Sequence, residues 1–239
     1  MKTAEARALG DRVAAHVRAN ELAGAYALLA PVLARRTPFA KLGLIGQAVG
    51  KEPAGLVDDF LELVASGETE GGWVIIGTAL GQQFDRDPAA CFKRCREHII
   101  AADVWYGADI LGERVPGPAL VSHFEPALAL LVPWREDENV WVRRAVGVAV
   151  HFWAKRSRGD RRLAAQAESL LAFLAPMFDE WEMPAVKGVG WGLKTLGKAY
   201  PELVAAWLPA QLPRRHRALM LRKALTYLSE EQRQRVTAS

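Results

Sequence analysis

Apolar and polar residues follow a helical period along nearly the whole chain. In the segments 53–66, 117–132 and 161–178, apolar residues recur at positions i, i+3, i+4 and i+7, which is the spacing of one face of an α-helix. Alanine and leucine, two strong helix formers, recur throughout these segments. No stretch of the sequence combines the two-residue period of a strand with flanking hairpin turns. The pattern therefore predicts an all-α fold.

Prolines mark the expected joints between helices, because proline is tolerated in the first turn of a helix and disfavoured in its interior. They predict about a dozen helices, including helices that start near 53, 118 and 184, with helix pairs roughly 35–45 residues apart. We expect a curved solenoid of HEAT-like antiparallel helix pairs that forms a single domain over residues 1–239 and lines a concave face. A globular helical bundle is the alternative. The expected joints are at Pro31, Pro38, Pro53, Pro88, Pro116, Pro118, Pro133, Pro176, Pro184, Pro201 and Pro213.

The net charge is +4 over 239 residues, and the basic residues gather in the C-terminal part. Residues 1–134 hold 13 Lys and Arg against 16 Asp and Glu, whereas residues 135–239 hold 18 against 11. A basic half favours a polyanionic partner. Solvated helix faces are the alternative explanation of this charge.

Several function classes find no support in the sequence. No apolar run approaches the roughly 18 residues that span a bilayer, and the N-terminus is not typical of a signal peptide, so we expect a cytoplasmic protein without a membrane anchor. The only two cysteines, Cys91 and Cys95, share a helix face, but no second Cys/His pair would complete a metal site. We therefore expect no metal and no cofactor. The five histidines lack HExxH-type spacing, and we expect His151 to be packed rather than catalytic.

Three of the eight tryptophans each share a helix face with a charged residue. Trp105 and Asp109 lie four positions apart, and Trp141 and Arg144 lie three apart. Trp191 belongs to a stripe with a lysine on either side, and residues at such spacings project from the same face. Packing of the indoles in the core beside extended charged side chains is the alternative. Three such helices favour a shared binding face.

Three glycines alternate within one expected helix, at Gly188, Gly190 and Gly192. Each glycine costs about 0.5–1 kcal/mol relative to alanine in a helix interior. We expect that another helix or the backbone of a ligand approaches closely at this point. The cluster lacks the pattern of a phosphate-binding loop.

At these residues the sequence resembles the AlkD-type DNA alkylation repair glycosylases. The resemblance is strongest over residues 98–208. It rests on a Trp followed four residues later by an Asp, on a W-[LV]-x-R segment at a helix start, and on a K-x-[IV]-G-W-x-L-[RK] segment. These motifs are matched by Trp105 and Asp109, by Trp141, Val142 and Arg144, and by Lys187, Val189, Gly190, Trp191, Leu193 and Lys194. The sequence departs from the family at Tyr106, where an acidic residue is common, and at Lys194, where arginine is common.

The resemblance implies a monomeric DNA glycosylase that excises cationic N3- or N7-alkylated purines from double-stranded DNA. It implies an active constellation of Asp109, Trp105, Trp191 and Arg144, and Asp109 argues against the relatives that bind DNA without excising bases. An alkylated purine is already a cation and leaves as a neutral base, so one carboxylate that stabilises the developing charge on the sugar is sufficient. The resemblance also implies that the lesion need not enter a pocket.

We expect the phosphate contacts to come from basic residues of the C-terminal half. DNA affinity should then fall with salt, with a log–log slope of about −0.9 per neutralised phosphate. A non-catalytic DNA-binding protein and a protein-interaction scaffold remain the alternative functions. The candidate DNA-binding residues are Arg143, Lys155, Arg156, Arg158, Lys187, Lys194, Arg214 and Arg215, with Arg161, Arg162, Arg217, Arg222 and Lys223 beside them.

Overall fold

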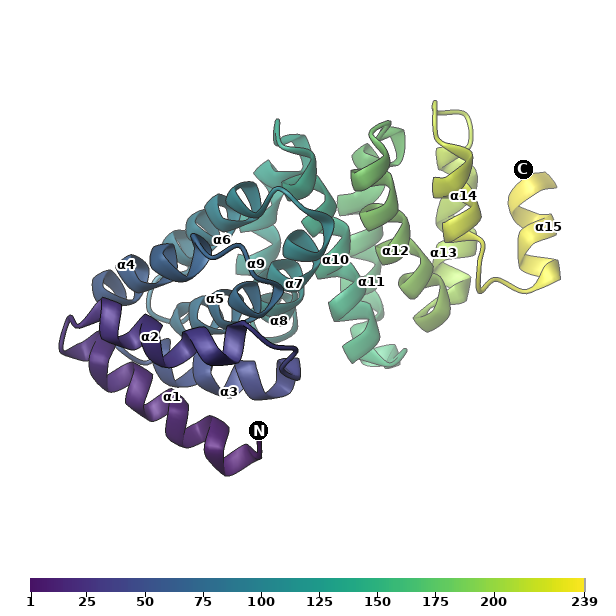
Figure 1. The fold of residues 1–239 in the computed structure, drawn as a ribbon. Helices are drawn as coiled ribbons and strands as arrows, with labels where there is room; N and C mark the ends of the chain where they lie inside the picture. Colours follow the sequence, from purple (N-terminus) through teal and green to yellow (C-terminus); the bar gives the residue numbers. More distant parts are fainter. Residues whose placement is uncertain (239) are drawn as a thin grey trace. The chain divides into compact units, whose positions relative to one another are not determined.

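The computed structural model describes residues 1–238, which consist of α-helices and short 3₁₀ helices without a strand in this range (Figure 1). The prediction of an all-α repeat fold is confirmed. The helices group into two compact units, Met1–Val115 and Pro116–Ser239, and each is described by itself. The prediction of a single domain over the whole chain stays a prediction.

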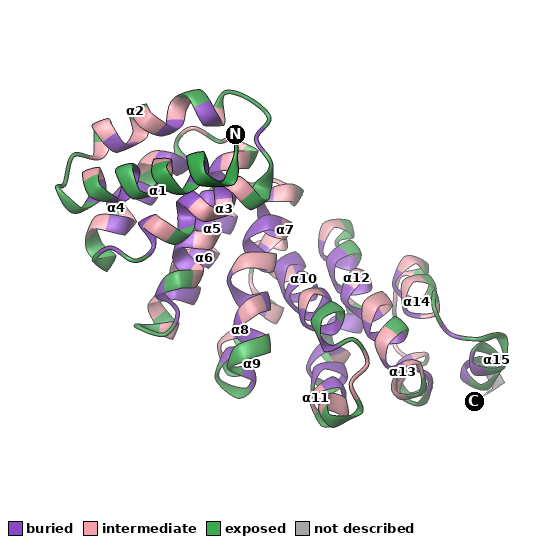
Figure 2. Cartoon of the chain, turned by 90° about the horizontal axis from the view of Figure 1, so that it is seen from below, coloured by how far each residue is buried: buried purple, intermediate pink, exposed green. Residues whose placement is uncertain are grey.

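The first unit stacks its helices in two layers. One layer contains α1, α3, α5 and α7, each packed on the next, and the other contains α2, α4 and α6. The central helix α5 is buried on every side from Trp73 to Ile76 (Figure 2), as expected for a helix turn that is covered all round. Its helices are α1 (Thr3–Arg18), α2 (Leu22–Leu33), α3 (Phe39–Val49), α4 (Ala54–Ala65), α5 (Glu70–Gln83), α6 (Pro88–Ala102) and α7 (Trp105–Arg114).

The second unit repeats this arrangement. Its inner helices α8, α10, α12 and α14 pack in succession, and on the other side α11 contacts α13 and α13 contacts α15. Its elements are α8 (Pro116–Ser122), α9 (Phe124–Leu131), η1 (Val132–Glu136), α10 (Val140–Ser157), η2 (Arg161–Leu163), α11 (Ala164–Leu174), η3 (Ala175–Asp179), α12 (Met183–Ala199), α13 (Pro201–Trp207), η4 (Leu208–Gln211), α14 (Ala218–Ala224) and α15 (Glu230–Ala238).

Three expected helix boundaries are wrong. Pro118 lies inside α8, which begins at Pro116. Pro31 lies inside α2, which continues to Leu33, so this proline marks the last turns of a helix rather than a joint. The helix expected from 118 to 132 is divided at His123 into α8 and α9. Pro126 accounts for the break, because its ring would clash with the carbonyl of Ser122 in a continuous helix.

Polar side chains fix where the helices that carry candidate site residues begin and end. Asn139 Oδ1 accepts hydrogen bonds from the backbone N–H groups of Trp141 at 2.9 Å and Val142 at 3.3 Å, which starts α10. Asp103 adopts a left-handed conformation, with φ of 43°, at the end of α6, and only Val104 separates it from α7. These local signals determine which turn of each helix presents the expected charged and aromatic side chains.

The two cysteines are buried in α6. The Cys91 thiol donates a hydrogen bond to the carbonyl of Leu80 at 3.2 Å. Burial raises the pKa of Cys91 to about 12 and raises that of Cys95 well above its usual value, so both thiols stay protonated. Within the described residues, no helix is long and apolar enough to cross a bilayer.

Candidate nucleic-acid interface

The closest helix crossing in the second unit lies between α10 and α12, at glycines. A Cβ atom on Gly188 would overlap the carbonyl oxygen of Arg144, and one on Gly147 would overlap the backbone of Gly188. A Cβ on Gly192 would lie 2.8 Å from the carbonyl oxygen of Gly147. The glycines thus allow two helix backbones to touch, which is one of the two explanations that the sequence offered for the cluster. The crossing sets the register in which α10 and α12 present their outer side chains.

Beside this crossing, α12 presents a basic stripe. Lys187, Trp191, Lys194 and Lys198 occupy positions i, i+4, i+7 and i+11 of the helix, so they project from one face. The predicted stripe of Lys187, Trp191 and Lys194 is therefore present, and Lys198 extends it by one turn.

Two hollows flank Trp191, and both are lined by Trp191 and Lys194. The first, which we name the Arg222 hollow, has a volume of about 520 Å³ and is also lined by Arg144, Lys187, Arg222 and Lys223. The second, the Tyr227 hollow, has a volume of about 470 Å³. Its cations are Lys155, Arg158, Lys194 and Lys198, and its rings are His151, Trp191 and Tyr227.

The residues that line these hollows are basic rather than acidic. None of the described residues that line either hollow is an aspartate or a glutamate. Burial, and then repulsion from Lys194, Arg222 and Lys187, lower the pKa of Lys223. Like charges held together in this way attract a polyanion, because its phosphates relieve the mutual repulsion. The surface is therefore suited to a nucleic-acid backbone.

Trp191 is held in place by its neighbours on α10 and α12. The His151 ring stacks on its indole with ring centres 3.8 Å apart and an angle of 22° between the planes. The Thr195 hydroxyl lies 3.0 Å from the carbonyl oxygen of Trp191, to which it donates, and 2.7 Å from His151 Nδ1. Because the hydroxyl proton is used on the carbonyl, Nδ1–H of His151 donates to Thr195 Oγ1. The indole is thus preorganised before any ligand arrives.

Arg143 and Arg144 are adjacent in sequence but differ in surroundings. Arg144 is buried, donates to the carbonyl of Pro184 at 3.1 Å, and lines the Arg222 hollow. Arg143 is paired with Glu180 at 2.7 Å and Glu182 at 3.3 Å, and it donates to the carbonyl of Asp137. Arg143 thus ties the start of α10 to the segment before α12, and its predicted contact with DNA stays a prediction.

The other expected DNA-binding residues also divide into two groups. Lys155 and Arg158 line the Tyr227 hollow, whereas Arg156 lies over the Phe152 ring at 5.1 Å. Arg214 pairs with Asp179 at 2.7 Å and donates to the carbonyl of Ala175. Arg215 lies over the ring of Trp181, 3.9 Å from its centre, and Arg217 lies over the same ring at 3.8 Å. The structure brings Lys155, Arg158, Lys187 and Lys194 to the two hollows and holds Arg156, Arg214 and Arg215 in contacts elsewhere.

In the first unit, Trp105 and Asp109 lie one turn apart on α7, as expected from their spacing. Trp105 is the first residue of the helix and is 57% exposed. Its ring packs edge-to-face against Tyr106 with ring centres 5.7 Å apart, so Tyr106 supports the indole. Asp109 is half-buried. The pair places an exposed aromatic ring and a carboxylate on one helix face.

Residues 46–228 match the family of the DNA alkylation repair enzyme. The chain belongs to this family. No curated protein and no solved structure matches the chain. Membership assigns the protein an enzymatic role in the repair of alkylated DNA, and the matched range contains both hollows and the Trp105–Asp109 pair.

Several residues that line the two hollows were not predicted from the sequence. Lys198 could have been found by continuing the helical spacing of Lys187 and Lys194. Tyr227 follows α14 and reaches the lysines of α12, with ammonium groups 5.4 and 5.5 Å from its ring centre. His151 is packed, as expected, but it is packed against Trp191 and lines the Tyr227 hollow. Nothing in the local sequence indicates these last two contacts.

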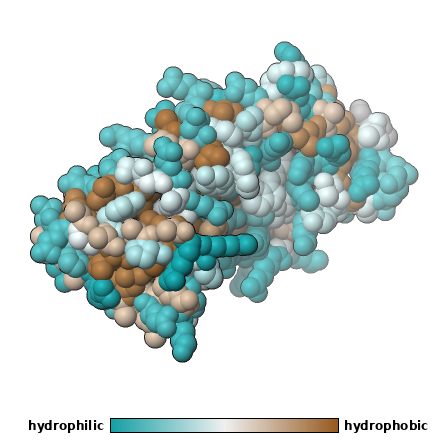
Figure 3. Space-filling view, viewed as in Figure 1, coloured by the Kyte–Doolittle hydropathy of each residue, from teal (hydrophilic) through white to brown (hydrophobic). Residues whose placement is uncertain are grey.

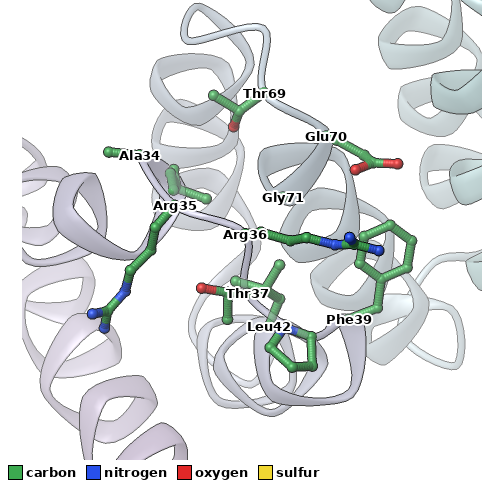
Figure 4. Close-up of a pocket in the computed structure, with 11 residues that line it drawn as sticks. Ala34, Arg35, Arg36, Thr37, Phe39, Leu42, Thr69, Glu70 and Gly71 are labelled. Atoms are coloured by element: carbon green, nitrogen blue, oxygen red, sulfur yellow. The ribbon is translucent and has the colours of Figure 1, made fainter. Parts of the chain in front are cut away.

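The first unit contains a larger hollow of about 800 Å³ between the starts of α3 and α5 (Figure 4). Two arginines, Arg35 and Arg36, and the carboxylate of Glu70 line it together with apolar residues that include Phe39 and Leu42. Hydrophobic residues reach the surface in this part of the unit (Figure 3), and Phe39 is 39% exposed. This hollow lies largely before residue 46 and lacks the uniform charge of the other two, so we do not assign it to DNA.

His151 makes the stability of the protein depend on pH. Burial, and then repulsion from Lys155, lower the pKa of His151 from 6.5 to about 4. Between about pH 6.5 and pH 4, His151 binds a proton in the unfolded chain but not in the folded protein. The free energy of unfolding should therefore fall as the pH is lowered through this range, and His151 should cause no further loss below about pH 4. The His151→Gln variant should lack this part of the pH dependence. The free energy of unfolding of both proteins, measured between pH 7 and pH 4.5, checks this; parallel curves would contradict it.

Proposed function

We propose that the protein is a DNA glycosylase that excises cationic N3- or N7-alkylated purines from double-stranded DNA. Family membership supports a role in alkylation repair. The observation that carries the proposal is the pair of hollows around Trp191, which present eight cations and, among the described lining residues, no carboxylate. Such a surface suits a phosphate backbone, and Lys194 lines both hollows.

In this proposal Asp109 supplies the catalytic charge. When the glycosidic bond to an alkylated purine breaks, positive charge develops on the deoxyribose while the base leaves as a neutral molecule. A fixed carboxylate stabilises that charge and can orient the attacking water. No acid is required to protonate the leaving base, which is consistent with a site that depends on a single carboxylate.

The other three residues of the predicted constellation would bind rather than react. The indoles of Trp105 and Trp191 offer π-faces that attract a cationic nucleoside and exclude water. Arg144 would contact a phosphate from the wall of the Arg222 hollow. Its guanidinium already donates to the carbonyl of Pro184, so its orientation is fixed in advance. An arginine held in this way loses little freedom on binding.

The test is release of free base from duplex DNA treated with a methylating agent, followed by mass spectrometry. We expect 3-methyladenine, 7-methylguanine or both to appear in proportion to enzyme, and none from untreated DNA. Binding measured from 50 to 200 mM salt should weaken with a log–log slope of about −0.9 per phosphate contacted. Binding without base release would support the non-catalytic alternative, and absence of both would support the scaffold.

A further inference from the structure

Two arginines of the second unit lie against one exposed indole. Trp181 precedes α12 and is 40% exposed. The guanidinium carbons of Arg215 and Arg217, which precede α14, lie 3.9 and 3.8 Å from the centre of its ring. Carbon atoms in contact lie about 3.5–4.0 Å apart, so both guanidinium groups touch the ring. We name Trp181, Arg215 and Arg217 the arginine clamp.

Contact with a ring holds a guanidinium without using its N–H groups. The group has several N–H donors in one plane, and an arginine that stacks on an aromatic face presents them at its edge. Arg217 uses its Nε to donate to the carbonyl of Trp181 at 3.0 Å, which leaves its terminal nitrogens. Arg215 is exposed, and within the described residues its guanidinium makes no hydrogen bond. Both arginines therefore keep donors for a ligand.

The acidic residues beside the clamp are engaged by other arginines. Arg143 pairs with Glu180 at 2.7 Å and with Glu182 at 3.3 Å. Arg214 pairs with Asp179 at 2.7 Å. Within the described residues, no carboxylate pairs with either arginine of the clamp. The two positive charges are therefore available to an anion from outside the chain.

The position of the clamp favours phosphate as that anion. Trp181 lies just before α12, and Lys187, in the second turn of that helix, lines the Arg222 hollow. Arg217 is the residue before α14, and Leu219, two positions later, lines the same hollow. The helices α12 and α14 pack against each other (Figure 1). The clamp therefore adjoins the basic hollow, and a partner with repeated phosphates can contact both.

We propose that the arginine clamp is a further binding site for the DNA backbone. The edges of Arg215 and Arg217 hold phosphate oxygens, for which the planar fork of arginine is suited. Trp181 is a positioning residue, because its ring contacts the two guanidinium groups and fixes their orientation. The inference rests on the proposed function only in taking DNA as the partner, and it requires no base release.

The charge of the clamp is tested by binding of an undamaged duplex from about 50 to 200 mM salt, since each neutralised phosphate adds about 0.9 to the log–log slope. Arg215→Ala should lower the slope by about this amount and weaken binding about tenfold at about 100 mM salt. Arg215→Lys keeps the charge and should keep the slope. Its affinity should still fall about threefold, because an ammonium group cannot form the bidentate fork.

The positioning role is tested at Trp181. Trp181→Leu removes no charge, so the slope should stay, but affinity should fall about fivefold because binding must then order two freed arginines. Trp181→Phe keeps an aromatic ring and should keep most of the affinity. In a protein with both Arg215→Ala and Arg217→Ala, Trp181→Leu should cause no further loss of affinity. A further loss in that background would contradict the positioning role.

Arg12 is the control for exchange of arginine for lysine. It is exposed on α1, lies before the range that matches the family, and contacts no aromatic ring within the described residues. Arg12→Lys should bind the duplex as tightly as the unaltered protein. Full affinity in Arg215→Lys would show that charge alone matters and would overturn the clamp.

Base release from methylated DNA is measured separately, so that the two proposals can fail independently. Base release together with an unchanged slope in Arg215→Ala would overturn the clamp alone. A reduced slope in this variant without base release by the unaltered protein would support the clamp and remove the glycosylase proposal. Absence of duplex binding by the unaltered protein would overturn both.

Discussion

Asp109→Asn is expected to slow base release from alkylated DNA by about 100-fold or more, because it removes a preorganised charge that acts only in the transition state. Asparagine has nearly the shape of aspartate, so α7 and the exposed ring of Trp105 should stay in place. DNA affinity should change less than about twofold, because the carboxylate contributes nothing to phosphate binding. The measurement is single-turnover release of 7-methylguanine together with binding of undamaged duplex.

A neighbouring carboxylate provides the control. Asp103 is exposed and lies at the joint between α6 and α7 with φ of 43°, a conformation that asparagine also tolerates. Asp103→Asn removes the same charge from the same segment and should leave base release nearly unchanged. Equal effects of the two variants would assign the loss to net charge, and unchanged release in Asp109→Asn would exclude Asp109 from the mechanism.

Gly188→Ala is expected to destabilise the protein by about 3 kcal/mol, at the upper end of the usual cost of overpacking. The added methyl group would overlap the carbonyl oxygen of Arg144, and a backbone group that belongs to α10 cannot turn aside as a side chain does. The gain in helix propensity, about 1 kcal/mol, offsets only part of this cost. Separation of the helices would also displace Arg144 and Lys187, so DNA affinity should fall with stability.

Two other helical glycines give a graded comparison. A Cβ on Gly190 would meet the Lys223 side chain at 3.1 Å, and one on Gly55 would meet nothing within 4 Å. Gly190→Ala should therefore cost less than Gly188→Ala, and Gly55→Ala should stabilise its helix by about 0.4–1 kcal/mol. Thermal unfolding of the three variants checks the order. Equal effects at positions 188 and 55 would contradict the role of close backbone contact.

The features that depend on spacing along one helix were predictable. The stripe of Lys187, Trp191 and Lys194, the shared face of Trp105 and Asp109, and the start of α10 after Asn139 all follow from helical geometry and local capping. The glycines of α12 also indicated close approach, although they could not name α10 as the neighbour. These properties are local, so the amino-acid sequence is sufficient to determine them.

What only the tertiary structure decided is which side chains from different helices meet. Arg143 and Arg144 are adjacent in sequence, yet Glu180 and Glu182 pair with Arg143 while Arg144 lines a hollow. His151 meets Trp191 forty residues later, and Tyr227 meets the lysines of α12. Such contacts depend on the register and distance at which helices cross. In this protein, Gly147 and Gly188 set the register and the distance between α10 and α12. The periodicity of a single helix encodes neither of these two quantities.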